Sequence, residues 1–217
     1  MRKKELFKRY ALFVFSLYVC ALGVAFTKVG SLGVSAISSI PNVLSLRFEA
    51  LTIGNWTFLL NCVFILGQIL ILGKEFEWIQ LLQLPMSFLF GWFTDISVWM
   101  VSFIPISGYI MRLAMVVIGV CILALGVTLG VIANVILNAG EGIVKAIAIK
   151  TKKEFGNIKV FFDISCIVTA VILSLILFNG QIQGVREGTL IAAFLNGNMV
   201  KVYSRFLKEP LNKALSK

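Results

Sequence analysis

Two similar stretches decide the fold: RYALFVFSLYVCALGVAF at residues 9–26 and RLAMVVIGVCILALGVTL at residues 112–129. Each begins with arginine, continues as an apolar run and carries Ala-Leu-Gly-Val at the same place, so the second follows the first by 103 residues. An apolar run of about 20 residues can cross a bilayer as a helix. The chain is therefore predicted to contain membrane spans that recur in its two halves.

Apolar runs of this kind extend over most of the chain. Of its 217 residues, 59% are hydrophobic and 14% are charged, whereas soluble domains average about 25% charged residues. A soluble domain of this size could not bury so much apolar surface. Six runs are predicted as spans, at residues 10–27, 56–72, 78–103, 113–131, 160–178 and, more weakly, 188–203.

Two further apolar segments, residues 34–46 and 137–149, are shorter. A helix of this length measures about 20 Å, and the hydrocarbon core is about 30 Å thick. Both segments are predicted to be half-helices that re-enter the protein, because irregular backbone at membrane depth is tolerated only inside protein or beside a water-filled cavity.

The duplication continues beyond the first span. Gly54-Asn55 and Asn61 match Gly156-Asn157 and Asp163 at an offset of 102, and residues 88–91 match residues 194–197 at an offset of 106. The predicted fold is an all-α polytopic membrane protein with repeats at 10–105 and 110–204, each of three spans plus a half-helix. Three is odd, so the repeats would be inverted. If the short segments spanned fully, eight spans would give parallel repeats.

Charge predicts the orientation. The net charge is +10, and the basic residues cluster in the N-terminal segment 1–9, at 150–153 and in the C-terminal part from Lys201, which includes the basic tail 205–217. Basic flanks of spans stay in the cytoplasm, so both termini are expected there, in a bacterial cytoplasmic membrane. No motif predicts nucleic-acid binding.

Catalytic and metal chemistry find little support in the sequence. It contains no histidine, which removes the commonest general base and metal ligand. The four cysteines all lie in apolar runs and form no CxxC pair. We therefore expect no enzyme activity, no cofactor and no metal site.

Glycine-rich motifs resemble those of the YczE/YitT-like bacterial integral membrane proteins. They comprise Ala21-Leu22-Gly23, residues 30–35, residues 52–56 and Gly91 with Asp95, and in the second half Ala124-Leu125-Gly126, residues 140–142, residues 155–157 and residues 188–190. The resemblance covers about residues 8–205 and implies a permease-like membrane protein without specifying a substrate. Ser35–Ser39 and Asn138–Glu141 stand where relatives carry Gly-Pro or Asp.

Polar residues within a membrane are candidates for function, and half-helix N-termini can hold polar groups. The predicted site consists of Ser35, Ser38, Asn55, Asn61, Asn138, Glu141, Asn157 and Asp163, with Asp95 and Lys145 as secondary candidates. Local alternatives are that Ser and Asn only cap the half-helices, and that Glu141 pairs with Lys145, as Asp163 would with Lys159.

The leading hypothesis is a permease that moves a small polar solute, cationic or zwitterionic or coupled to protons, through a site between the repeats. The alternative is a scaffold or regulatory partner that transports nothing. The expected partners are the lipid bilayer and the solute, and a homodimer is left open.

Overall fold

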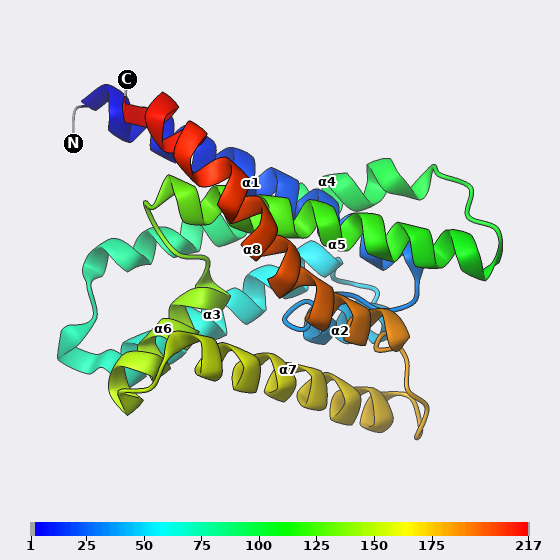
Figure 1. Ribbon diagram of the computed structural model, residues 1–217. Coiled ribbons are helices and arrows are strands. Elements are labelled where there is room, and N and C mark those ends of the chain that lie inside the picture. Colours follow the sequence, from blue (N-terminus) through cyan, green and yellow to red (C-terminus); the bar gives the residue numbers. More distant parts are fainter. Residues whose placement is uncertain (1–2, 217) are drawn as a thin grey trace.

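The computed structural model describes residues 3–216, and all regular elements in that range are helical (Figure 1). The long helices are α1 (Lys3–Gly30), α3 (Ile53–Leu72), α4 (Gln83–Ser102), α5 (Gly108–Ala133), α7 (Phe155–Leu177) and α8 (Glu187–Ser216). Short helices α2 (Ser39–Arg47) and α6 (Ala139–Thr151) follow α1 and α5, and the 3-10 turns η1 (Gly73–Glu75) and η2 (Trp78–Leu82) connect α3 to α4. The predicted all-helical fold is confirmed, although residues 1–2 and 217 of the predicted basic ends lie outside the described residues.

The helices differ in their ability to cross a membrane. Among the described residues, five are long and apolar enough to do so: α1, α3, α4, α5 and α7. Helix α8 has 30 residues but is less apolar, because Asn196, Asn198 and Lys201 interrupt its hydrophobic part. With 9 and 13 residues, α2 and α6 are about 14 and 20 Å long. Neither can cross a hydrocarbon core of about 30 Å as a helix, which contradicts the eight-span alternative.

Helices α1 and α5 form the centre of the molecule and run antiparallel, side by side (Figure 1). Their backbones touch because small residues face each other. A Cβ added to Gly23 would lie 2.5 Å from the backbone nitrogen of Leu123, and one added to Gly126 would lie 2.6 Å from the backbone nitrogen of Cys20. Small residues on facing helix surfaces allow this kind of close helix packing in membrane proteins.

Replacing Gly23 by alanine is expected to destabilise the protein by about 1–3 kcal/mol, the usual cost of overpacking a tight contact. The added methyl group would strike backbone, which cannot rotate away. Thermal unfolding of the detergent-solubilised protein measures the effect. Gly156→Ala is the matched control, because a Cβ at Gly156 would meet nothing within 4 Å. Equal melting temperatures for the two variants would contradict the close α1–α5 contact.

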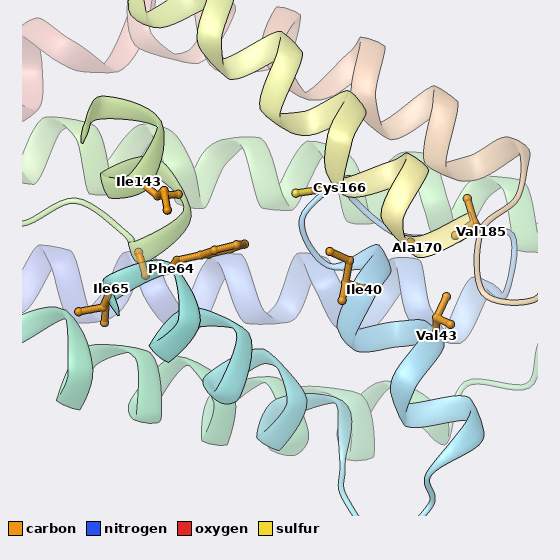
Figure 2. Close-up of a cluster of buried hydrophobic side chains, with 9 residues drawn as sticks. Ile40, Val43, Phe64, Ile65, Ile143, Cys166, Ala170 and Val185 are labelled. Carbon is orange, nitrogen blue, oxygen red and sulfur yellow. The ribbon is translucent and has the colours of Figure 1, made fainter. Parts of the chain in front are cut away.

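The remaining helices surround this central pair in a regular pattern. Helix α4 packs on α1 and α8 packs on α5, while short helix α6 packs on α3 and short helix α2 packs on α7. An apolar cluster shared by α2, α3, α6 and α7 holds the two short helices in place (Figure 2). The two halves differ in the contact between their last two long helices. Helix α3 packs along α4, but no comparable contact joins α7 to α8 within residues 3–216.

Several connections between the long helices lie at two opposite ends of the molecule. The start of α1, the end of α8, the 73–82 connection and the loop after α6 lie at one end, and the 103–107 and 178–186 connections lie at the other (Figure 1). The first end carries the described residues of the N-terminal basic cluster, residues 150–153 and the described residues of the basic tail 205–217. We call it the basic end.

Candidate functional site

A cavity of about 620 Å³ lies where the N-terminal ends of α2 and α6 meet. The two ends touch, since a Cβ added to Gly140 would lie 2.8 Å from Cδ1 of Ile37. Helices α1, α3, α4, α5, α7 and α8 complete the walls. Of the predicted site residues, Ser35, Ser38, Asn61, Asn138, Glu141 and Asp163 line this cavity. The structure therefore brings together six side chains that are widely separated in the sequence.

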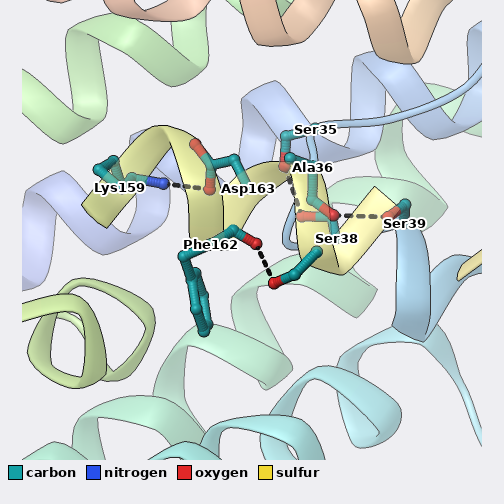
Figure 3. A network of polar contacts seen from close by, with 8 residues as sticks. Ser35, Ala36, Ser38, Ser39, Lys159, Phe162 and Asp163 are labelled. Atoms are coloured by element: carbon teal, nitrogen blue, oxygen red, sulfur yellow. Dashed lines mark hydrogen bonds and ion pairs between the residues drawn. The ribbon is translucent and has the colours of Figure 1, made fainter. Parts of the chain in front are cut away.

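The segment before α2 contributes two hydroxyl groups to the cavity. Ser35 Oγ donates a hydrogen bond of 2.9 Å to Ser38 Oγ (Figure 3). Ser38 occupies the N-cap position, yet its side chain accepts no capping hydrogen bond. Helix α2 begins at Ser39, five residues later than the predicted start, because residues 36–38 form a turn and residues 34–35 have no regular structure.

The start of α6 contributes an amide and a carboxyl group. Asn138 is the N-cap residue, and its side chain makes no capping hydrogen bond. Glu141 lies in the first turn of α6 and is half-buried. Both predicted caps are thus absent, and the alternative in which Ser38 and Asn138 serve only as capping residues is wrong. A helix N-terminus with uncapped N–H groups favours a polar or anionic neighbour.

Two buried glutamines fix the position of α6. Gln68 Nε2 donates to the carbonyl oxygen of Ala139 at 3.2 Å and to Gln83 Oε1 at 3.0 Å. Gln83 Nε2 donates back to Gln68 Oε1 at 3.2 Å. These hydrogen bonds join α3, α4 and the first residue of α6. A rigid support of this kind holds Glu141 at the cavity wall.

Helix α7 presents an ion pair to the same cavity. Lys159 and Asp163 pair across one helical turn, as the spacing predicted, beside the Ser35–Ser39 segment (Figure 3). Lysine 201 on α8 also lines the cavity, and it forms no ion pair with another described residue.

Several cavity residues have polar side chains without a partner among the described residues. They are Asn61, Ser87, Asn138, Glu141, Asn196 and Lys201. Oδ1 of Asn196 is buried and unpartnered, and a buried polar group without a partner is costly. The arrangement is therefore suited to a polar ligand or to water, which would satisfy these groups.

Four predicted site residues lie elsewhere. Asn55 and Asn157 are exposed and do not line the cavity. Each precedes its partner, Asn61 or Asp163, by six residues. Because each helical residue turns about 100°, that spacing places the two side chains about 120° apart.

Asp95 and Lys145 are the other two. Asp95 accepts hydrogen bonds from Gly54 N at 2.9 Å and from Thr52 Oγ1 at 2.6 Å, so it joins α4 to the start of α3 instead of lining the cavity. Lys145 is exposed and forms no ion pair with Glu141. The alternative in which Glu141 pairs with Lys145 is wrong, because Glu141 lines the cavity, whereas Lys145 is exposed and does not line it.

Several cavity residues were not predicted as site members. Lys159 was expected only as a partner for Asp163. Asn196 and Lys201 weaken the apolar run at 188–203, and a polar residue within a span often faces a cavity, so both could have been recognised. Gln83 was not a site candidate, since its role depends on contacts between distant helices.

Comparison with known protein families finds one family model that matches residues 7–205 of the chain. The chain belongs to DUF6198, a family of unknown function. No curated protein and no solved structure matches it significantly. The family thus covers nearly the same residues as the YczE/YitT resemblance, but the match does not support that more specific name.

Proposed function

We propose that this DUF6198 member is a small permease that moves a polar solute through the cavity between its two halves. The observation that carries the proposal is the meeting of the two short helices at a cavity lined by unpartnered polar side chains. Half-helices whose N-termini meet in the membrane are the arrangement that secondary transporters use to bind polar solutes.

Inverted repeats are part of this proposal. Each half contains a long helix, a short helix and two more long helices, in that order. The packing of α4 on α1 resembles that of α8 on α5, and the packing of α6 on α3 resembles that of α2 on α7. If α8 crosses together with the five apolar helices, the chain makes six crossings, and its two ends both lie at the basic end, as three spans per repeat require. The positive-inside rule places this end in the cytoplasm.

The cavity has one unpaired acidic side chain, Glu141, and one unpaired basic side chain, Lys201, which suits a zwitterion or a cation that binds Glu141. Glu141 has no ion-pair partner, while Asp163 is already paired with Lys159. A cation, or the ammonium group of a zwitterion, could bind Glu141, and the carboxylate of a zwitterion could bind the unpaired Lys201 or the start of α6.

A non-transporting scaffold receives less support. Such a protein would need no polar cavity, and its internal polar side chains would satisfy one another. The unpartnered Asn61, Asn138 and Glu141 favour a cavity that takes up water or solute instead.

Flux into proteoliposomes tests the proposal. The purified protein is reconstituted, and uptake is measured for a panel of radiolabelled amino acids, choline and methylammonium. We expect uptake of at least one of these zwitterions or cations above that of protein-free liposomes. Background uptake for the whole panel, with protein shown to be folded by its melting transition, would argue for the scaffold.

A further inference from the structure

The seam between α3 and α4 is closed near the end opposite the basic end. Gly54 and Gly91 bring the two backbones into contact, since a Cβ added to Gly91 would lie 2.6 Å from the carbonyl oxygen of Gly54. Asp95, one turn beyond Gly91, accepts hydrogen bonds from Thr52 Oγ1 and Gly54 N. The glycine contact and the hydrogen bonds of Asp95 therefore hold α3 and α4 together. We call the contact line between two such helices a seam, and the pair of side chains that joins them, here Thr52 and Asp95, a clasp.

The seam between α7 and α8 contains the matching glycines but is open. In the register of the duplication, Gly156 corresponds to Gly54 and Gly197 corresponds to Gly91. A Cβ added to either Gly156 or Gly197 would meet nothing within 4 Å. The cavity extends into this space, where Phe155 and Val160 of α7 and Gly197 and Val200 of α8 line it.

The same register identifies a second pair of residues, in the second half, that is equivalent to Thr52 and Asp95. Thr52 corresponds to Glu154, and Asp95 corresponds to Lys201. A hydrogen-bonded pair in the first half is therefore replaced by an acid and a base in the second. Both side chains are exposed, and neither forms an ion pair with a described residue. Glu154 is the N-cap residue of α7, but its side chain makes no capping bond.

We infer that α7 and α8 form a gate that closes when Gly156 meets Gly197 and Glu154 pairs with Lys201, as α3 and α4 already meet in this structure. This inference rests on the proposed permease and assigns a role to each seam. The α3–α4 seam is the outer gate, which is closed here, and the α7–α8 seam is the inner gate, which is open toward the basic end. Glu154 and Lys201 are positioning residues that select the closed geometry.

A weak clasp suits this role. An exposed ion pair between flexible side chains contributes little free energy, because water screens it. The pair can therefore form and break during a transport cycle, while the two glycines remove the steric barrier to close approach. A side chain at either glycine would leave the open state undisturbed and would prevent closure.

Cross-linking in native membranes tests the gate without reference to any solute. The four native cysteines are replaced by alanine, and the pair Phe155→Cys and Val200→Cys is introduced, because both residues line the open seam and both glycines then stay in place. We expect a short bifunctional thiol reagent to join the two positions, because the open and closed states interconvert. The pair Thr52→Cys and Asp95→Cys is the positive control, since this structure already holds those side chains together. No cross-link at 155/200 while 52/95 reacts would overturn the gate.

Charge exchange tests the clasp in the same assay. Glu154→Lys or Lys201→Glu, added singly, should lower the 155/200 cross-linking rate several-fold, and the double exchange should restore it. Equal rates in all four backgrounds would overturn the role of the ion pair. A flux measurement distinguishes failure of the proposed gate from failure of the proposed permease. Flux without cross-linking refutes the gate alone, whereas cross-linking without flux for any solute refutes the permease and leaves the moving seam in place.

Discussion

Replacing Glu141 by glutamine is expected to reduce solute flux in proteoliposomes about tenfold or more, because a hydrogen bond to a charged group contributes about 1.5–3 kcal/mol. The substitution keeps the shape of the side chain and removes its charge. Glu141 lines the cavity at the start of α6 and has no ion-pair partner among the described residues. Its charge is therefore available to a solute cation or to a proton.

Glu77→Gln is the matched control for this variant. Glu77 is exposed between η1 and η2, and it does not line the cavity. Both variants should keep the wild-type melting temperature, and only Glu141→Gln should lose flux. Unchanged flux in Glu141→Gln would show that the carboxyl group of Glu141 takes no part in solute transport. Equal losses in both variants would indicate an effect of overall charge.

A covalent bridge across the outer seam is expected to abolish flux reversibly. Cysteines at positions 52 and 95 replace side chains whose oxygens lie 2.6 Å apart, so a disulfide or a short reducible cross-linker can join them. The bridge would hold α3 against α4 and prevent the outer gate from opening. Flux should fall to the level of protein-free liposomes and return on reduction.

Each single-cysteine variant serves as a control for the bridge. Neither should respond to the cross-linker, although loss of the Thr52–Asp95 hydrogen bond lowers stability somewhat in both. Flux that continues through fully bridged protein would show that α3 and α4 need not separate, and the assignment of an outer gate would be wrong.

The long helices could be predicted from the sequence because their signal is local. Apolar runs of sufficient length define α1, α3, α4, α5 and α7, and the shortness of residues 34–46 and 137–149 predicted that α2 and α6 would not cross. The Lys159–Asp163 pair could be predicted for the same reason, because its partners are one helical turn apart.

Site membership could be predicted only in part, because it depends on which helix face meets the cavity. Asn61 and Asp163 face it, whereas Asn55 and Asn157 point away despite lying on the same helices. Asp95 was a candidate because it lies within a predicted span. Its actual partners, Thr52 and Gly54, depend on the packing of α4 against α3, which the sequence does not reveal. The open seam between α7 and α8 could not be predicted, because the glycine pairs of the two halves look alike in the sequence.

Accessibility of the cavity from the two sides of the membrane tests the proposed transport mechanism most directly. Ser38→Cys places a thiol at the cavity wall, and a membrane-impermeant thiol reagent is applied to right-side-out and inside-out vesicles. We predict reaction from both sides, with outside labelling lost when positions 52 and 95 are bridged and inside labelling lost when positions 154 and 201 are bridged. Labelling from one side only, unaffected by either bridge, would contradict alternating access through this cavity.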